Sequence, residues 1–198
     1  MIVCYYMEND TLNRVVVWGA TLIFVLLEFY SLTTGSHYKW DFFFVLGAAW
    51  VVYHYRDRLR LNWIHYFLFV GFLILHNFGT FGLYSNFYFG LEYDLYVHSL
   101  FGLSAGLILF RAFGLNKGNL KKRWHLVWMV SVLAIGLSAM HEVFIEFFGA
   151  LLLGKGEGVL YIGAGDIDQW DTQKDLLFNF IGSVVGVALS GIRRVFRK

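Results

Sequence analysis

Long apolar runs separated by short polar connectors divide the chain into six predicted membrane-spanning helices. A helix crosses about 30 Å of hydrocarbon with about 20 residues, because each residue adds about 1.5 Å. Backbone polar groups must be hydrogen-bonded within lipid, which favours helices, and the sequence lacks the alternation typical of barrel strands. The predicted spans are 14–32, 40–55, 62–79, 94–113, 124–149 and 173–195. The pattern therefore predicts an all-α, polytopic transmembrane helix bundle that forms a single domain, residues 1–198.

The composition excludes a soluble globular protein. Hydrophobic residues make up 58% of the chain and charged residues 15%, compared with about 45–50% and about 25% in ordinary soluble domains. A soluble domain of 198 residues cannot bury that much apolar surface. Cys4 is the single cysteine, which also excludes a disulfide-stabilised scaffold.

The distribution of basic residues predicts which way the bundle faces. Of the 16 Lys and Arg residues, 13 lie at the N-terminus, in the second and fourth connectors or at the C-terminus. Because basic residues favour the cytoplasmic side, we expect both termini there and a multi-pass location in the plasma or inner membrane. Topology accounts for these basic residues, so we expect membrane lipids and no nucleic acid as partners.

Ionisable residues gather at the opposite, outer ends of three predicted helices. They form three pairs, each spaced by four residues: Asp94 with His98, Glu142 with Glu146, and Asp171 with Asp175. Such a spacing places both members on one helix face, and Asn179 continues the third face. Asp94 and Asp171 also fit as simple helix caps. Glu142 and Glu146 lie near a helix C-terminus, where the helix dipole disfavours negative charge, so we expect a cation, protons or donors beside them.

Glycines predict close helix packing and a loop over this outer end. Gly102 with Gly106, and Gly182 with Gly186, match the G-x-x-x-G spacing of close helix pairs. The glycine-rich segment 154–171, which ends in Trp170, is predicted to form either a lid over the acidic residues or a plain connector.

Several motifs resemble those of the YjdF-type inner-membrane proteins. They are SAMHEVFIEFFGALLLGKGEG (138–158), GDIDQWDTQKDLLFNFIGS (165–183), and the YDLYVH run that contains Asp94 and His98. The resemblance spans about 70–190 and singles out Asp94, His98, Glu142, Glu146, Trp170, Asp171, Gln173 and Asp175. The two glutamates lie one residue further apart than in that family, and HNFGTFG (76–82) departs from its pattern. A weaker likeness to VanZ-like membrane proteins comes from the D-x-x-x-H and D-x-x-x-N-x-x-G spacings. The resemblance implies a topology and no particular reaction.

Three functions fit these observations. The first is a metal-dependent membrane enzyme that acts on a lipid or envelope-linked substrate at the outer face. Its expected cofactor is a divalent cation, because carboxylates and imidazoles together suit such ions. Its expected catalytic residues are Asp94, His98, Glu142, Glu146 and Asp175; its metal ligands are these five and Asp171; and its further binding residues are Trp170, Asp171, Gln173 and Asn179. The alternatives are an ion or proton transporter and a non-enzymatic membrane partner or assembly protein.

Overall fold

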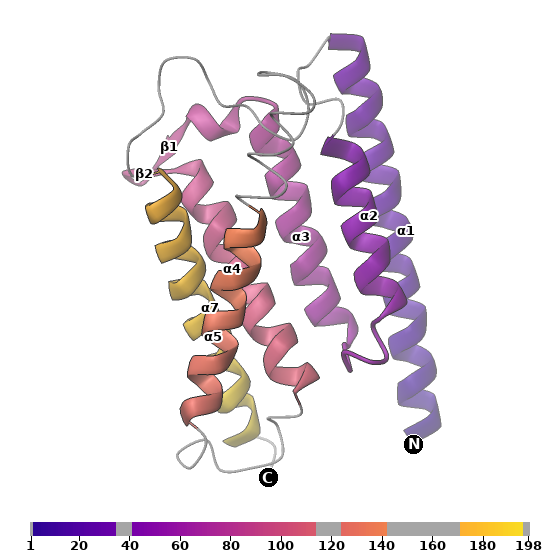
Figure 1. Ribbon diagram of the computed structural model, residues 1–198. Helices are drawn as coiled ribbons and strands as arrows, with labels where there is room; N and C mark the ends of the chain where they lie inside the picture. Colours follow the sequence, from indigo (N-terminus) through magenta and orange to yellow (C-terminus); the bar gives the residue numbers. More distant parts are fainter. Residues whose placement is uncertain (1, 35–40, 114–123, 142–170, 196–198) are drawn as a thin grey trace.

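The computed structural model describes residues 2–34, 41–113, 124–141 and 171–195, which form a bundle of roughly parallel helix axes (Figure 1). The helices are α1 (Ile2–Thr34), α2 (Asp41–His54), α3 (Trp63–Thr80), α4 (Tyr93–Ala112), α5 (Trp124–Met140) and α7 (Asp171–Val195). Each of the six apolar segments predicted from the sequence therefore contains a helix. The part of the fifth segment beyond residue 141 lies outside the described residues.

Three of these helices are long and apolar enough to span a membrane: Asp10–Thr34 within α1, Trp63–Thr80 and Tyr93–Ala112. The surface has the character expected of lipid contact. Along α1, for example, Trp18, Leu22 and Phe29 are each more than 60% exposed, whereas Val17 and Phe24 are buried. Large apolar side chains exposed along one helix face are disfavoured in water, so this face fits a hydrocarbon environment.

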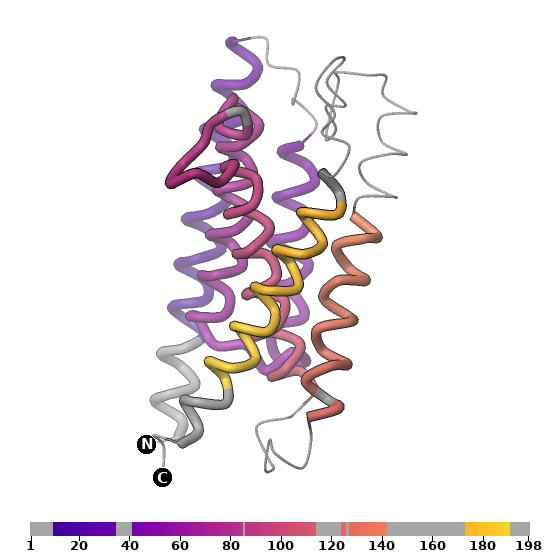
Figure 2. Tube along the Cα trace, turned by 90° about the vertical axis from the view of Figure 1, so that its left-hand side faces the viewer, coloured from indigo at the N-terminus to yellow at the C-terminus, as the bar shows by residue number. Residues whose placement is uncertain are grey.

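The helices form two groups, each with its own apolar core. Buried residues of α1, α2 and α3 make one core, with Phe24, Val45 and Tyr66 among its members. Phe110, Val130 and Val187 make the other core, between α4, α5 and α7. Contacts between α3 and α4 join the two groups. Figure 2 shows the bundle from the side, with α5 and α7 packed beside the other helices.

Helices α4 and α7 run in the same direction and touch through their glycines. A Cβ atom on Gly102 would lie 2.0 Å from the backbone oxygen of Asn179, and one on Gly182 would lie 2.1 Å from the backbone oxygen of Ser99. One turn further along, a Cβ atom on Gly106 or on Gly186 would lie 2.5 Å from a backbone oxygen of the facing helix. The packing role predicted for the two G-x-x-x-G pairs is thereby confirmed.

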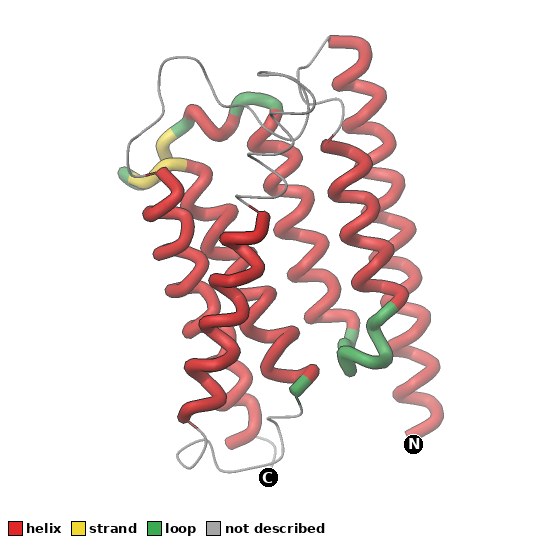
Figure 3. Tube along the Cα trace, viewed as in Figure 1, coloured by secondary structure: helices red, strands yellow, loops and turns green. Residues whose placement is uncertain are grey.

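A short turn-rich segment joins α3 to α4 at the end of the bundle where α4 and α7 begin (Figure 3). It contains the 3-10 helix η1 (Leu83–Ser85) and a hairpin of β1 (Phe87–Tyr88) with β2 (Leu91–Glu92). Gly82, with φ +102°, reverses the chain after α3, a conformation that glycine adopts without strain. The sequence analysis foresaw no strands here; the hairpin lies in a connector between two predicted spans. The reversal at Gly82 returns η1 towards the end of α3.

Candidate functional site

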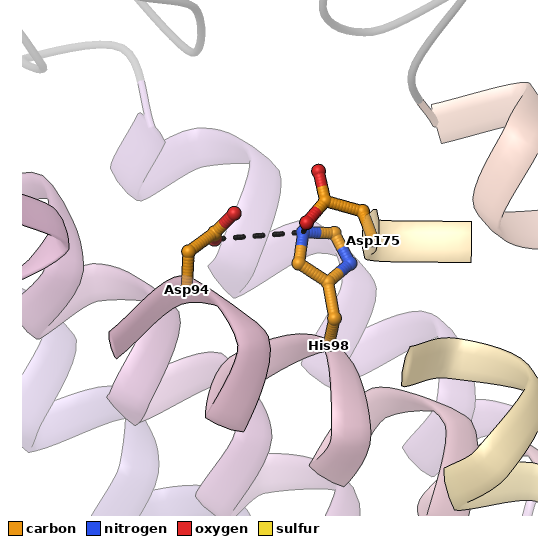
Figure 4. A group of neighbouring side chains, drawn as sticks. All are labelled: Asp94, His98 and Asp175. Carbon is orange, nitrogen blue, oxygen red and sulfur yellow. Dashed lines mark ion pairs between the residues drawn. The ribbon is translucent and has the colours of Figure 1, made fainter. Parts of the chain in front are cut away.

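Two aspartates and a histidine converge where α4 and α7 begin (Figure 4). His98 Nε2 lies 3.5 Å from Asp94 Oδ1 and 3.5 Å from Asp175 Oδ1. One ligand atom from each of the three residues lies within 4.8 Å of the other two. Asp94 and His98 lie one turn apart on α4, and the close α4–α7 contact brings Asp175 beside them. We call these three residues the Asp-His-Asp cluster.

The Asp-His-Asp cluster is largely removed from solvent. The side chain of Asp175 is 4% exposed, and those of His98 and Asp94 are 16% and 24% exposed. Two carboxylates there face a single imidazole, so even a protonated His98 leaves the cluster with one excess negative charge. Burying uncompensated charge is costly, and a cation or a shared proton would offset that cost.

Asn179 determines the environment of the second nitrogen of His98. Its amide nitrogen Nδ2 lies 2.9 Å from His98 Nδ1 and also donates to the hydroxyl of Ser138 on α5. Asn179 is fully buried, and its Oδ1 has no hydrogen-bond partner among the described residues. When the amide donates to Nδ1 of a neutral ring, the ring proton resides on Nε2, between the two carboxylates.

A second polar cluster, which the sequence analysis did not identify, joins α2, α3 and η1. Asp41 is fully buried, and its Oδ1 lies 3.0 Å from His76 Nε2. Its Oδ2 accepts a hydrogen bond of 2.6 Å from Asn77 Nδ2. On the other side of the same ring, the Tyr84 hydroxyl lies 2.6 Å from His76 Nδ1. We call Asp41, His76 and Tyr84 the Asp-His-Tyr chain.

His141, which directly follows α5, lies between the two clusters. Its ring centroid is 6.3 Å from that of His76 and 5.3 Å from that of Phe44. Its electrostatic neighbours include both His76 and His98. The end of the bundle where α4 and α7 begin therefore carries polar side chains from both helix groups.

The structure gathers only part of the set of site residues predicted from the sequence. Asp94, His98, Asp175 and Asn179 come together, and each helix contributes two residues spaced by four, as predicted. Gln173 is exposed, on a different face of α7 from the buried Asp175. Asp171 begins α7, but its side chain is outside the description.

Other predictions lie beyond the described residues. They concern Glu142, Glu146, Trp170 and the glycine-rich segment 154–171, predicted as a lid or a connector, of which only residue 171 is described. The structure therefore does not test their roles.

The sequence analysis assigned no role to Asp41 or to His76. The interaction joins residues 35 positions apart, and no helical spacing links them. The one usable signal was that both lie at predicted helix ends on the same side, since α2 begins where α3 ends.

The sequence comparisons identify the chain's relatives at the level of a family. The family described as "Predicted membrane protein (DUF2238)" matches residues 13–195, nearly the whole chain. No curated protein and no solved structure shows significant similarity. The match supports membrane location across both helix groups and assigns no reaction to the site.

Proposed function

The chain belongs to the DUF2238 family of predicted membrane proteins, and we propose that it binds a divalent cation at the Asp-His-Asp cluster. The observation that carries this proposal is the convergence of three ligand atoms within 4.8 Å. A tetrahedral ion with bonds of about 2.1 Å holds its ligand atoms about 3.4 Å apart. Two of the three separations, both from His98 Nε2, are 3.5 Å and so lie close to that spacing.

The donor set narrows the choice of ion. One imidazole with two carboxylates suits Zn²⁺, Mn²⁺ or Fe²⁺ better than Ca²⁺ or Mg²⁺, which prefer oxygen ligands only. Three protein ligands would leave a position for water or substrate. A bound ion would supply Lewis acidity and an activated water, and its outer position favours a lipid or envelope-linked substrate.

Asn179 would act as the residue that orients His98 towards the ion. Binding through Nε2 requires the ring proton on Nδ1, and a ligating histidine commonly donates that proton to a neighbouring oxygen. Rotation of the Asn179 amide by half a turn places Oδ1 where Nδ2 lay, so that Oδ1 accepts hydrogen bonds from His98 Nδ1 and from the Ser138 hydroxyl. We therefore expect cation binding to reverse this amide.

We expect Zn²⁺ or Mn²⁺ to raise the melting temperature of the chelator-treated protein in detergent. Binding to the folded state alone adds about 2.7 kcal/mol at a hundredfold excess over Kd. Asp175→Asn and His98→Gln should abolish the shift, because each removes a ligand atom. Asn179→Leu should weaken affinity about 10–100-fold, whereas Asn179→Asp, which accepts a hydrogen bond from Nδ1, should retain binding.

Asp57→Asn is the matched control, because Asp57 is an exposed carboxylate in the turn between α2 and α3, and its shift should equal that of the wild type. If none of these ions changes the melting temperature of the wild type, or if Asp175→Asn keeps the full shift, the cation site is refuted. A proton-sharing structural cluster would then be the better explanation of the three residues.

We further propose six spans in the plasma or inner membrane, with both termini cytoplasmic. The start of α1 and the end of α7 lie at one end of the bundle, together with the arginine-rich α2–α3 turn (Figure 1). The Asp-His-Asp cluster lies towards the opposite end, which would face outward. We also propose that the chain belongs to the YjdF-type subgroup, because residues 170–173 read WDTQ, as in that subgroup. The topology implied by that resemblance agrees with the one proposed here.

A pair of exposed positions tests the orientation. In a Cys4→Ser background, Asn86→Cys beside the hairpin should react with an impermeant maleimide added to intact cells. Asp57→Cys in the α2–α3 turn should react only after the cells are lysed. The reverse labelling pattern, or equal labelling of both positions in intact cells, would contradict the proposed topology.

A further inference from the structure

The Asp-His-Tyr chain aligns an acid, an imidazole and a hydroxyl in one line of hydrogen bonds. Asp41 Oδ1 lies 3.0 Å from His76 Nε2, and His76 Nδ1 lies 2.6 Å from the Tyr84 hydroxyl. Because a carboxylate only accepts, the Nε2 proton points to Asp41. The neutral ring then presents an unprotonated Nδ1 to Tyr84, which donates its proton there.

Asp41 has stabilising interactions besides that with His76. Asn77 Nδ2 donates a hydrogen bond of 2.6 Å to the second oxygen of Asp41, and this contact keeps the carboxylate oriented towards His76. Asp41 also lies in the first turn of α2, where the helix dipole stabilises a negative charge. An ionised, oriented Asp41 stabilises the imidazolium that forms when His76 accepts a proton.

The Tyr84 ring fits against the end of α3 because Gly79 has no side chain. A Cβ atom on Gly79 would lie 2.4 Å from the Tyr84 ring, so glycine there lets the ring lie flat on the helix. The ring of Tyr93 also contacts the Tyr84 ring, edge to face, at a centroid distance of 5.9 Å. Tyr84 itself is only partly buried, so its side chain keeps some contact with the surroundings.

We propose that Tyr84 is a nucleophile, with His76 as its general base and Asp41 as the residue that positions His76. In the step, the phenolic proton moves to His76 Nδ1 and the Tyr84 oxygen bonds to an acyl carbon. The bond from that carbon to its leaving group breaks, and the leaving group departs with the electron pair. It then takes the proton from Nδ1, so the products are an acylated Tyr84 and a free alcohol or thiol.

The chemistry of a phenol sets the class of substrate. A tyrosine hydroxyl has an ordinary pKa of about 10, so it displaces groups that are no more basic than itself. Activated acyl compounds, that is, aryl esters and thioesters, meet this condition, and simple alkyl esters do not. The proposal uses no residue of the Asp-His-Asp cluster and does not depend on cation binding there.

Acetylation by p-nitrophenyl acetate tests the proposal on the full chain in detergent. The reaction is run with a chelator present, so that a bound cation plays no part. Peptide mapping by mass spectrometry follows the acetyl group on each tyrosine. Tyr88, in the nearby hairpin and 42% exposed, is the internal reference. We expect Tyr84 to acetylate at least about tenfold faster than Tyr88, although Tyr88 is the more accessible.

Four variants separate activation from mere exposure. His76→Gln keeps a donor to Asp41 but removes the base, and it should slow Tyr84 to the rate of Tyr88. Gly79→Ala removes no polar group but displaces the Tyr84 ring, and it should have the same effect. Gly71→Ala, on the same helix with nothing within 4 Å of its added Cβ, should react as the wild type does. Tyr84→Phe should remove the acetylated peptide and so verify the assignment.

Two results would overturn the proposal. The first is a Tyr84 rate no greater than that of Tyr88 in the wild type. The second is an undiminished Tyr84 rate in His76→Gln, with the variant's melting temperature showing that it is folded. If Gly79→Ala fails to fold, the His76→Gln comparison alone decides.

Discussion

Replacing His76 with leucine should destabilise the protein by about 3–5 kcal/mol, because it leaves the charge of the fully buried Asp41 without its main partner. A loss of this size corresponds to a fall in melting temperature of about 10 °C for a chain of this length. Thermal unfolding in detergent, followed by circular dichroism, measures it. The variant should therefore lose far more stability than a typical apolar substitution.

A second buried histidine provides the control. His65 is buried near the start of α3, and its ring nitrogen Nδ1 bonds to the side chain of Asn62, the residue that caps this helix. His65→Leu should therefore cost only about 1 kcal/mol. The double variant Asp41→Leu/His76→Leu should recover part of the loss, because no unpaired charge is then buried. A melting temperature for His76→Leu within 2 °C of the wild type would show that Asp41 is not held as a buried carboxylate by His76.

The second large effect should come from adding a methyl group where α4 meets α7. In Gly182→Ala the new Cβ would lie 2.1 Å from the backbone oxygen of Ser99, so the two helices must move apart. The backbone cannot move aside as the end of a flexible side chain can, and overpacking of this kind destabilises the folded protein by about 1–3 kcal/mol. The separation also moves Asp175 away from His98, so the variant should lose cation binding as well as stability.

Gly136→Ala tests whether the effect is specific to that contact. Gly136 lies in α5 and has nothing within 4 Å of an added Cβ. Alanine favours helix over glycine by about 1 kcal/mol, so this variant should be as stable as the wild type or more stable. Thermal unfolding with and without Zn²⁺ measures both properties. An unchanged melting temperature and an unchanged Zn²⁺ shift in Gly182→Ala would mean that α4 and α7 are not in close contact.

Local sequence determined the helices. An apolar run long enough to cross a bilayer must satisfy its backbone hydrogen bonds internally, which favours a helix, and each of the six segments contains one. Helices α2, α3, α4 and α7 begin and end close to the predicted bounds, whereas α1 begins at Ile2, well before the predicted start at residue 14. The four-residue spacing of Asp94 and His98 likewise sufficed to place them on one face of α4. The glycine motifs predicted close packing correctly for the same reason, since their spacing is a property of one helix.

Tertiary structure decided which polar faces meet. Helical spacing does not select Asp175, among the several acids near these helix ends, as the neighbour of Asp94; the α4–α7 contact made that choice. Asp41 and His76 come from different helices, and Tyr84 reaches His76 only because Gly82 reverses the chain. Periodicity reports which residues share a face of one helix, but a pairing between helices depends on how their backbones approach. In this protein Gly102 and Gly182 allow the backbones of α4 and α7 to touch, and Gly79 leaves room for the ring of Tyr84.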